Sequence, residues 1–250
     1  MLASIRRCYG LARSTVIYHG HPLRRRRARA FYRAFVRPGD LCFDVGAHVG
    51  DRTAHFLALG ARVVAVEPQP LPLAALRRLF GKNPRVTIVD AALGAAPGEA
   101  ELAIDPSNPT VASLSPQWRA QVAQVASFAG TRWRERRRVR VTTLDALIAA
   151  HGRPDFCKID VEGFEADVLE GLSQPLPALS FEYIAGALDA ALAALDRVAA
   201  LGPYRFNRSP GESMRFPLET WRSREEMAAE LRRLPVTHGS GDIYARLDRA

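Results

Sequence analysis

The sequence predicts an α/β fold in which a mostly parallel sheet is covered by helices on both faces. From residue 40 onward, short apolar runs rich in β-branched residues alternate with longer segments of helical period, the pattern of repeated strand-helix-strand units. Glycines follow four of the helical segments, where helices commonly end. A chain of 250 residues that is 48% hydrophobic is also long and apolar enough to bury one large core.

Five short apolar runs are expected to be strands, and each ends in or near an acidic residue. In open parallel sheets, ligands bind outside the carboxyl ends of the strands, so repeated acids at these ends indicate a site. The expected strands cover residues 41–45, 62–67, 86–90, 155–161 and 179–183.

Helices are expected between and after these strands, with terminating glycines at positions 60, 81, 152 and 202. A further strand closes the chain, because residues 242–247 alternate between apolar and polar. The expected helices cover residues 51–59, 71–80, 144–150, 165–172, 187–201 and 220–234.

The chain divides at Asp40, its first acidic residue. Residues 1–39 carry ten of the 35 basic residues and are interpreted as a basic helical arm. The remaining 25 basic and 26 acidic residues leave residues 40–250 near neutral, and this part is expected to be a single domain. Within it, residues 94–143 form an insertion that we expect to shape the substrate side. The insertion contains a predicted strand pair, 100–104 with 111–114, and the run TRWRERRRVRV.

The cysteines and the apolar runs exclude several classes of protein. Cys8, Cys42 and Cys157 are too scattered for a disulfide framework or a zinc site. No uncharged apolar run approaches the roughly 18 to 20 residues of a membrane span. We therefore expect a cytoplasmic protein, although an arginine-rich, acid-free start is also typical of an organellar transit peptide.

The segment FDVGAHVGDRT, residues 43–53, has the position of a nucleotide-cofactor loop between a strand and a helix. Gly46 and Gly50 lack the third glycine of the dinucleotide pattern GxGxxG, and no GK[ST] follows to cradle phosphates. Asp44 instead places a carboxylate beside the loop, which suits a cationic cofactor that bears an amine. These features favour S-adenosylmethionine over a pyrophosphate-containing ligand.

Acidic residues also end the next strands. Glu67 lies 17 residues after Gly50, where a carboxylate can accept hydrogen bonds from both ribose hydroxyls. Asp90 ends the third strand, where its side chain or the following backbone N–H can contact an adenine edge. NAD enzymes share an acid at the position of Glu67, so an NAD-dependent oxidoreductase stays an alternative that the glycine spacing disfavours.

The stretch DFCKIDVEGFEADVLEGL, residues 155–172, is the most distinctive in the chain. Lys158, Asp160 and Glu162 alternate through the end of a buried strand, where charges are costly unless they are paired or used. Glu182 adds a carboxylate from the neighbouring strand. A buried Lys-Asp ion pair with a purely structural role is the alternative explanation.

Together these segments resemble the FkbM-type methyltransferases. The matching segments are, in order, DVGAHVG, VEPQP, DAALG, SL, TLDAL, KIDVEGFEADVLEGL and FEY, which span residues 43–183. The resemblance implies a Rossmann-like class I methyltransferase fold with a seven-stranded sheet and S-adenosyl-L-methionine as cofactor. It also implies O-methylation of a hydroxyl group on a sugar or secondary metabolite.

The resemblance and the loop positions assign the cofactor site. Asn83 and Ser113 also match the family pattern, without an assigned role. His48 departs from it, because the family has Asn there, and an imidazole that titrates near physiological pH would make cofactor affinity depend on pH. The expected cofactor-binding residues are Asp44, Gly46, Ala47, His48, Gly50, Thr53, Glu67, Pro68, Asp90, Ala91 and Asp160.

Methyl transfer to oxygen requires alignment of the reactants and removal of the hydroxyl proton. Asp160 and Glu162 are the candidate bases, with Asp160 nearer the amino-acid part of the cofactor and Glu162 or Glu182 nearer the acceptor. Lys158 is expected to polarise a neighbour or to stabilise an oxyanion. The expected acceptor is a hydroxylated small molecule, such as a sugar or a phosphorylated compound.

Two alternatives stay open from the sequence. No metal ligand set is predicted, although the converging carboxylates are able to bind a divalent ion that would assist the reaction. The basic arm and the run around Trp133 also allow an RNA- or polyanion-binding protein, with arginines on phosphates and the indole stacked on a base. The near-neutral charge of residues 40–250 and the lack of repeated aromatics in the arm disfavour this second alternative. The use of arginine in place of lysine is also typical of GC-biased coding, which explains the arginines without a binding role.

Overall fold

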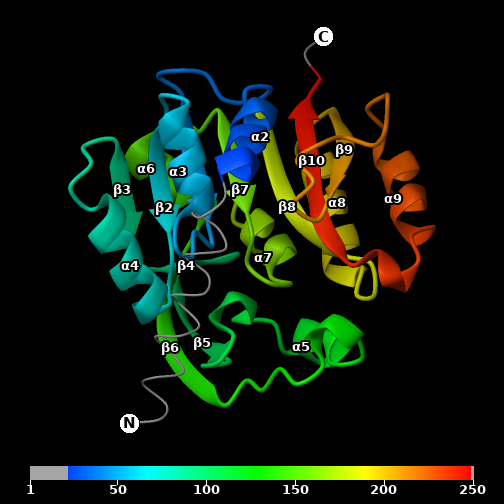
Figure 1. The fold of residues 1–250 in the computed structure, drawn as a ribbon, viewed down its shortest axis with the longest axis horizontal. Coiled ribbons are helices and arrows are strands. Elements are labelled where there is room, and N and C mark those ends of the chain that lie inside the picture. The colour runs from blue at the N-terminus through cyan, green and yellow to red at the C-terminus, as the bar shows by residue number, and fades with distance from the viewer. Residues whose placement is uncertain (1–21, 249–250) are drawn as a thin grey trace.

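The structure, a computed structural model, describes residues 22–248 and contains a seven-stranded sheet (Figure 1). Its strand order is β3-β2-β1-β7-β8-β10-β9. All neighbouring pairs are parallel except those of β10, which runs antiparallel to both β8 and β9. The predicted mostly parallel α/β fold is therefore confirmed. The strands are β1 (Leu41–Val45), β2 (Arg62–Val66), β3 (Val86–Val89), β7 (Phe156–Ile159), β8 (Ala178–Ile184), β9 (Tyr204–Pro210) and β10 (Ser240–Leu247).

The order of the strands reverses between β1 and β7. The chain builds outward from β1 through β2 to β3, and later returns to place β7 on the other side of β1. In the register of the sheet, Asp44 lies between Ala65 of β2 and Lys158 of β7. This switch point is where open α/β sheets leave a crevice beyond the carboxyl ends of their strands.

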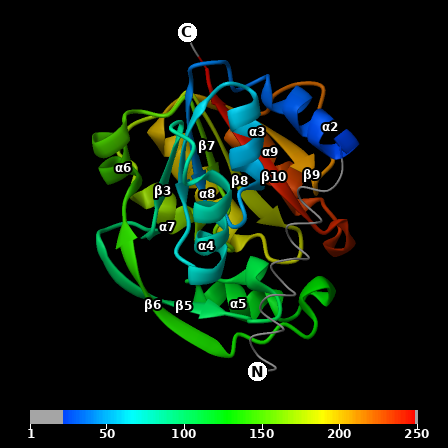
Figure 2. The same cartoon turned by 60° about the vertical axis from the view of Figure 1, so that its left-hand side comes forward.

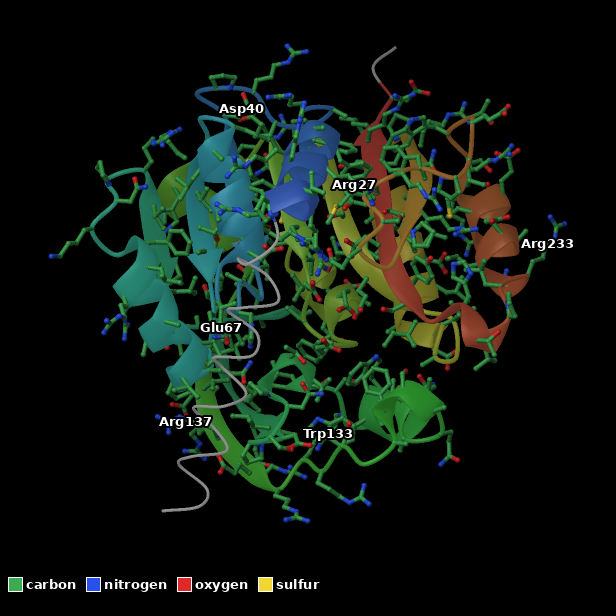
Figure 3. All side chains as sticks on the ribbon, viewed as in Figure 1. Arg27, Asp40, Glu67, Trp133, Arg137 and Arg233 are labelled. Carbon is green, nitrogen blue, oxygen red and sulfur yellow. The ribbon has the colours of Figure 1, made fainter. Side chains whose placement is uncertain are left out.

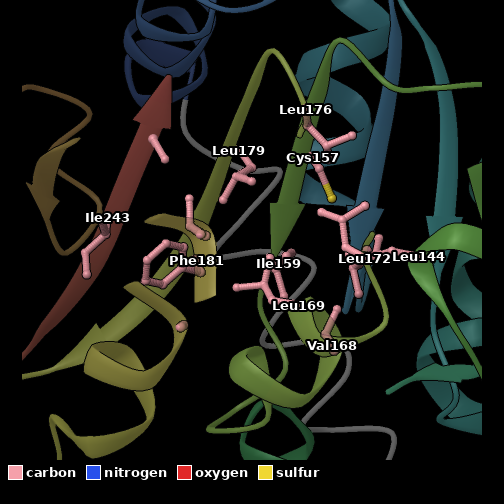
Figure 4. Packing of buried hydrophobic residues seen from close by; sticks show 14 of the residues in the cluster. Leu144, Cys157, Ile159, Val168, Leu169, Leu172, Leu176, Leu179, Phe181 and Ile243 are labelled. Atoms are coloured by element: carbon pink, nitrogen blue, oxygen red, sulfur yellow. The ribbon is translucent and has the colours of Figure 1, made fainter. Parts of the chain in front are cut away.

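Helices cover both faces of the sheet, as Figure 2 shows. Buried residues of α2, α3 and α4 form one core cluster, and buried residues of α6, α7, α8 and α9 form another against the opposite face. Figure 4 shows part of this second cluster, where Leu169 and Val168 of α7 lie beside Ile159 of β7. The helices are α2 (Pro22–Tyr32), α3 (Asp51–Ala58), α4 (Pro70–Phe80), α6 (Leu144–His151), α7 (Glu165–Glu170), α8 (Asp189–Leu201) and α9 (Arg224–Arg232).

The described part of the basic arm is helix α2, which packs on the sheet. Ala28 and Tyr32 are almost fully buried in the same cluster as Phe56 of α3 and Tyr244 of β10. The Tyr32 and Phe56 rings meet edge to face, with their centroids 5.1 Å apart. Helix α2 therefore contributes to the core beside the sheet, while residues 1–21 of the predicted arm lie outside the described residues.

The insertion, together with the two residues just before it, forms a second, three-stranded sheet with the order β4-β6-β5. Its strands are β4 (Ala92–Leu93), β5 (Gly98–Ile104) and β6 (Glu135–Thr142), and helix α5 (Pro116–Val122) follows β5. The predicted strand 100–104 is part of β5, but residues 111–114 form no strand and meet β5 only at an isolated antiparallel bridge from Ala103 to Ser113. The partner of β5 is β6, the arginine-rich run.

Strand β6 was not predicted, because its many arginines hide the alternation of buried and exposed residues along it. Val139 and Val141 are buried under the small sheet, whereas the arginines between and before them are exposed. Arg136 and Arg138 pair with glutamates of β5 across the outer face. Trp133, just before the strand, donates its indole N–H to the Val111 carbonyl at 2.7 Å, and its ring meets the Trp118 ring edge to face with the centroids 6.3 Å apart.

Candidate functional site

Two adjoining cavities lie beyond the carboxyl ends of β1, β2 and β7. The first, here called the Glu67 cavity, is mostly apolar and is also lined by Pro68 and Ala91. The second, the Arg52 cavity, is lined by acidic groups and one guanidinium. The residues that line both are Gly46, His48, Thr110, Asp160 and Glu162. Figure 3 shows Glu67 at the end of the sheet that faces the insertion, with Asp40 at the opposite end.

The loop after β1 is shaped by Gly46. Its φ is +77°, and a Cβ built there would lie 1.8 Å from the carbonyl oxygen of Asp160. The loops after β1 and β7 therefore touch backbone to backbone, which only glycine permits. Gly46 and Ala47 both donate their N–H to the Val66 carbonyl of β2, at 3.0 Å each.

Asp44 is buried at the end of β1 and lines the Arg52 cavity. Thr53, from the first turn of α3, donates its hydroxyl to an Asp44 oxygen at 2.5 Å. Burial raises the pKa of Asp44 to about 6, and the Thr53 hydrogen bond opposes this rise. The carboxylate is thus fixed in orientation by its neighbour on α3.

Glu67 is held by two backbone donors at the end of β2. The side chain is 2% exposed, and its two oxygens accept N–H bonds from His48 at 2.9 Å and from Gln69 at 2.7 Å. Burial raises its pKa to about 7, against the lowering effect of these bonds. A carboxylate fixed on both oxygens presents its remaining lone pairs to the cavity in a set direction.

Three carboxyl groups meet at the acidic end of the site. Within the described chain, Asp160, Glu162 and Glu182 have carboxylate oxygens that lie within 4.8 Å of one another. Burial and the neighbouring Asp160 charge raise the pKa of Glu162 well above its ordinary range, and burial and Glu162 do the same for Glu182. Such a cluster must share protons or a cation, because three carboxylate charges this close together repel strongly. Among residues 22–248 it is the one group of three or more such side chains close enough to hold a metal ion together, and carboxylates are ligands that divalent metals prefer.

One family model matches the chain, and solved structures share its fold. The family model described as "Methyltransferase FkbM domain" matches residues 44–185, which is more than half of the chain. The chain belongs to the FkbM methyltransferase family. It is an S-adenosylmethionine-dependent methyltransferase with the class I Rossmann-like fold. A search of the curated proteins finds no match.

Solved structures similar to this FkbM methyltransferase share its fold at low sequence identity. A TehB-like SAM-dependent methyltransferase from Corynebacterium glutamicum is 10% identical, with 98% of this chain and 99% of that one covered and a TM-score of 0.50. An O-methyltransferase from Bacillus cereus in complex with SAH is 12% identical, with 96% and 91% covered and a TM-score of 0.50. In the described residues of this chain, no helix is long and apolar enough to cross a membrane.

The cavities fit S-adenosylmethionine in shape and charge. The Glu67 cavity offers an apolar slot with one fixed carboxylate, which suits an adenine ring with its attached ribose. The Arg52 cavity carries Asp44, Asp160 and Glu162, which suit a sulfonium and an ammonium group. The observation that most directly indicates a ligand is His48, whose two ring nitrogens are buried without a hydrogen-bond partner in the described structure.

His48 is neutral at physiological pH in this FkbM methyltransferase. Burial lowers the pKa of its imidazole to about 4, with a weaker opposing effect of Asp160. The expectation that His48 would titrate near physiological pH is therefore wrong, because that expectation used the pKa of an exposed imidazole. Its backbone, at a φ of +46°, supplies the N–H that holds Glu67.

Three residues expected at the cofactor lie beside the cavities and line neither. Gly50, with a φ of +80°, packs against Phe80 of α4, where a Cβ would lie 2.4 Å from the ring. Thr53 acts on Asp44, as described above. Asp90 is half-exposed and pairs with Arg77 at 3.3 Å, while its neighbour Ala91 lines the cavity. Asn83, which matched the family pattern, accepts the Arg85 N–H in the turn before β3.

Lys158 is fully buried and also lines neither cavity. Its ammonium lies 2.8 Å from Asp242 and 3.1 Å from Asp160, and it donates to the Ile159 carbonyl at 3.3 Å. Three N–H donors thus have three acceptors. This placement favours a role in holding Asp160 over the oxyanion role expected from the sequence.

The insertion completes the site by contacting the loop after β7. Ser113 donates its hydroxyl to the Glu162 carbonyl at 2.6 Å. A Cβ on Gly163 would lie 2.0 Å from Trp118 of α5, so the indole packs directly on this glycine. These contacts hold Glu162 in a left-handed conformation with a φ of +55°. Ser113 matched the family pattern without a role, and the structure now supplies one.

Sequence reasoning missed Arg52, Thr110 and Asp242. Arg52 lines the second cavity, bound to Asp51 at 2.5 Å and to Glu212 at 2.7 Å, with its buried Nε left without a partner. Its position directly after the glycine loop was the available signal. Thr110 and Asp242 carried no signal, because each reaches the site only through the folding of a distant segment.

Proposed function

We propose that this methyltransferase transfers the methyl group to a hydroxyl oxygen of a small molecule, such as a sugar or secondary metabolite, bound beside Asp160, Glu162 and Glu182. The observation that carries the proposal is this carboxyl cluster at the rim of the cofactor cavities. Oxygen nucleophiles with a high pKa need a nearby proton acceptor when the methyl group is transferred. Carboxyl groups with raised pKa values near a hydroxyl binding site meet that need.

The proposed cofactor contacts follow the two cavities. Glu67 accepts hydrogen bonds from the ribose hydroxyls, while Pro68 and Ala91 contact the adenine ring. In the Arg52 cavity, Asp160 binds the ammonium of the amino-acid part and the free Nε of Arg52 binds its carboxylate. Gly46 and His48 line both cavities, and Ala47 lines the Arg52 cavity.

S-adenosylmethionine supplies an electrophilic methyl group on a sulfonium, and the protein residues align the acceptor and take its proton. Glu162 is the proposed base, because the Ser113 bond fixes its backbone beside Asp160. Burial raises the pKa of both Glu162 and Glu182, and the two would share one proton. The ionised one would accept the hydroxyl proton as the oxygen–methyl bond forms and the sulfur–methyl bond breaks, which leaves S-adenosylhomocysteine. Ser113 and Trp118 keep this loop in place.

The test is a homocysteine-release assay with a panel of hydroxylated acceptors and their deoxy analogues. We expect turnover with at least one sugar or secondary-metabolite hydroxyl and none with its deoxy form. The Glu162→Gln variant should lose about 100-fold or more in kcat while still binding S-adenosylhomocysteine. Glu170→Gln, a glutamate at the exposed end of α7, is the matched control. Methylation of nitrogen or carbon, or a Glu162→Gln enzyme with full turnover, would contradict the proposal.

A further inference from the structure

The ammonium of Lys158 is shared between two carboxylates from different parts of the chain. Asp160 follows β7, whereas Asp242 lies on the closing strand β10. Asp242 is the closer of the two, at 2.8 Å against 3.1 Å, and it is 10% exposed where Asp160 is 37% exposed. Asp160 therefore faces the cavities, and Asp242 contacts Lys158 from the protein interior.

Asp242 is itself held from the side of helix α2. Its second oxygen accepts the Tyr244 hydroxyl at 3.3 Å, and the hydroxyls of Tyr244 and Tyr32 lie 3.5 Å apart. In the register of the sheet, Asp242 is opposite Glu182. It lies outside residues 44–185, the segment matched by the family model.

The charges decide what this arrangement does. Lys158 with Asp160 and Asp242 carries a net charge of −1, whereas Lys158 with Asp160 alone would be neutral. Arg52, the other buried cation nearby, is balanced by Asp51 and Glu212. The negative charge that Asp160 keeps beside Lys158 therefore depends on the second carboxylate, Asp242.

We propose that Asp242 is a positioning residue that binds Lys158 and thereby leaves the Asp160 carboxylate free to bind the ammonium of the cofactor's amino-acid part. Without Asp242, the Lys158 ammonium would pair with Asp160 alone and neutralise it. The inference rests on the proposed contact between Asp160 and the cofactor. The proposal gives strand β10, which lies outside the segment matched by the family model, a role in cofactor binding.

The test compares two ligands by calorimetry, S-adenosylhomocysteine and 5′-methylthioadenosine, which lacks the amino-acid part. Asp242→Asn keeps an oxygen that accepts from Lys158 but removes the charge. We expect this variant to bind S-adenosylhomocysteine about tenfold more weakly, the size of one charged hydrogen bond, and methylthioadenosine as well as the wild type. A purely structural role would weaken both ligands together.

The double variant Asp242→Asn/Lys158→Met provides a charge-balanced comparison. It removes one cation and one anion, so Asp160 again supplies a net charge of −1. We expect S-adenosylhomocysteine affinity to return to within about threefold of the wild type. A threefold change corresponds to a binding free energy well below that of one charged hydrogen bond. Further loss of affinity in the double variant would overturn the proposal. If Asp242→Asn does not fold, Lys158→Met decides instead, and weaker binding of S-adenosylhomocysteine by that variant would overturn the proposal.

The matched control is Asp248→Asn, just after the same strand. Asp248 is 55% exposed, pairs with Arg205 at 3.2 Å and lines neither cavity. It should bind both ligands like the wild type. If the wild-type protein binds neither ligand, the proposed function fails. If it binds both and Asp242→Asn keeps the wild-type ratio of affinities, only the role of Asp242 fails.

Discussion

Gly46 gives the sharpest test of how the cofactor loop is built. In Gly46→Ala, the new methyl group would lie 1.8 Å from the carbonyl oxygen of Asp160, about half of a normal carbon–oxygen contact. This oxygen belongs to the backbone, so one of the two loops must move. Forcing an alanine to a φ of +77° costs roughly 1–2 kcal/mol, and overpacking a rigid contact adds roughly 1–3 kcal/mol. We therefore expect the free energy of unfolding to fall by about 2–5 kcal/mol.

Gly39 provides a matched control for this substitution. Its φ is +93°, and a Cβ there meets nothing within 4 Å. Gly39→Ala should therefore show only the backbone strain, roughly 1–2 kcal/mol, with normal cofactor binding. Urea unfolding gives the stabilities, and calorimetry with S-adenosylhomocysteine gives the affinities. Equal destabilisation in the two variants, with equal binding, would refute the close contact between the loops after β1 and β7.

Three further predictions concern charge, the insertion and metal. Since burial raises the folded-state pKa of Glu67 to about 7, its contribution to stability is present at pH 4 and lost as pH rises through 7. The measurement is urea unfolding of the ligand-free wild type and of Glu67→Gln at pH 5 and at pH 8. The stability of the variant relative to the wild type should be higher at pH 8 than at pH 5, by about 3 kcal/mol at most. An equal difference at both pH values would contradict this. Ser113→Ala removes the bond to the Glu162 carbonyl and should lower kcat about tenfold, with S-adenosylhomocysteine affinity unchanged in calorimetry; unchanged kcat would contradict it. We expect protons to offset the charge repulsion among Asp160, Glu162 and Glu182, so exhaustive chelation should leave methyl transfer unchanged. Loss of activity that only a divalent ion restores would show that the cluster binds metal.

Local sequence patterns were sufficient to predict every strand of the central sheet except β9. The acid-tipped apolar runs correspond to β1, β2, β3, β7 and β8, because each is short, apolar and bounded by a turn. Strand β9 was missed, since YRFNRSP carries charged and polar residues without strict alternation. Strand β6 was missed for a related reason, because its arginines are exposed on a sheet that only the insertion forms.

The candidate site divides in the same way between local and distant contributions. Asp44, Glu67 and Asp160 follow strands, and parallel strands bring their carboxyl ends together, so the sequence alone places them at one edge. Gly50 and Asp90 show the limit of this reasoning, since a residue beside a loop can face either the cavity or the protein. The contact of Asp242 with Lys158 depends on strand order at the far edge of the sheet, which no local pattern encodes.

The most direct test of the cofactor site is calorimetric binding of S-adenosylmethionine, S-adenosylhomocysteine and NADH to the wild-type protein and to Glu67→Ala. Glu67 lines the Glu67 cavity with a buried carboxylate whose two oxygens are held by backbone N–H groups, so it should determine recognition of the ribose. We expect micromolar binding of both sulfur nucleotides, a loss of at least tenfold in Glu67→Ala, and no binding of NADH. Binding of NADH alone, or sulfur-nucleotide affinity unchanged in Glu67→Ala, would contradict the assignment of this cavity.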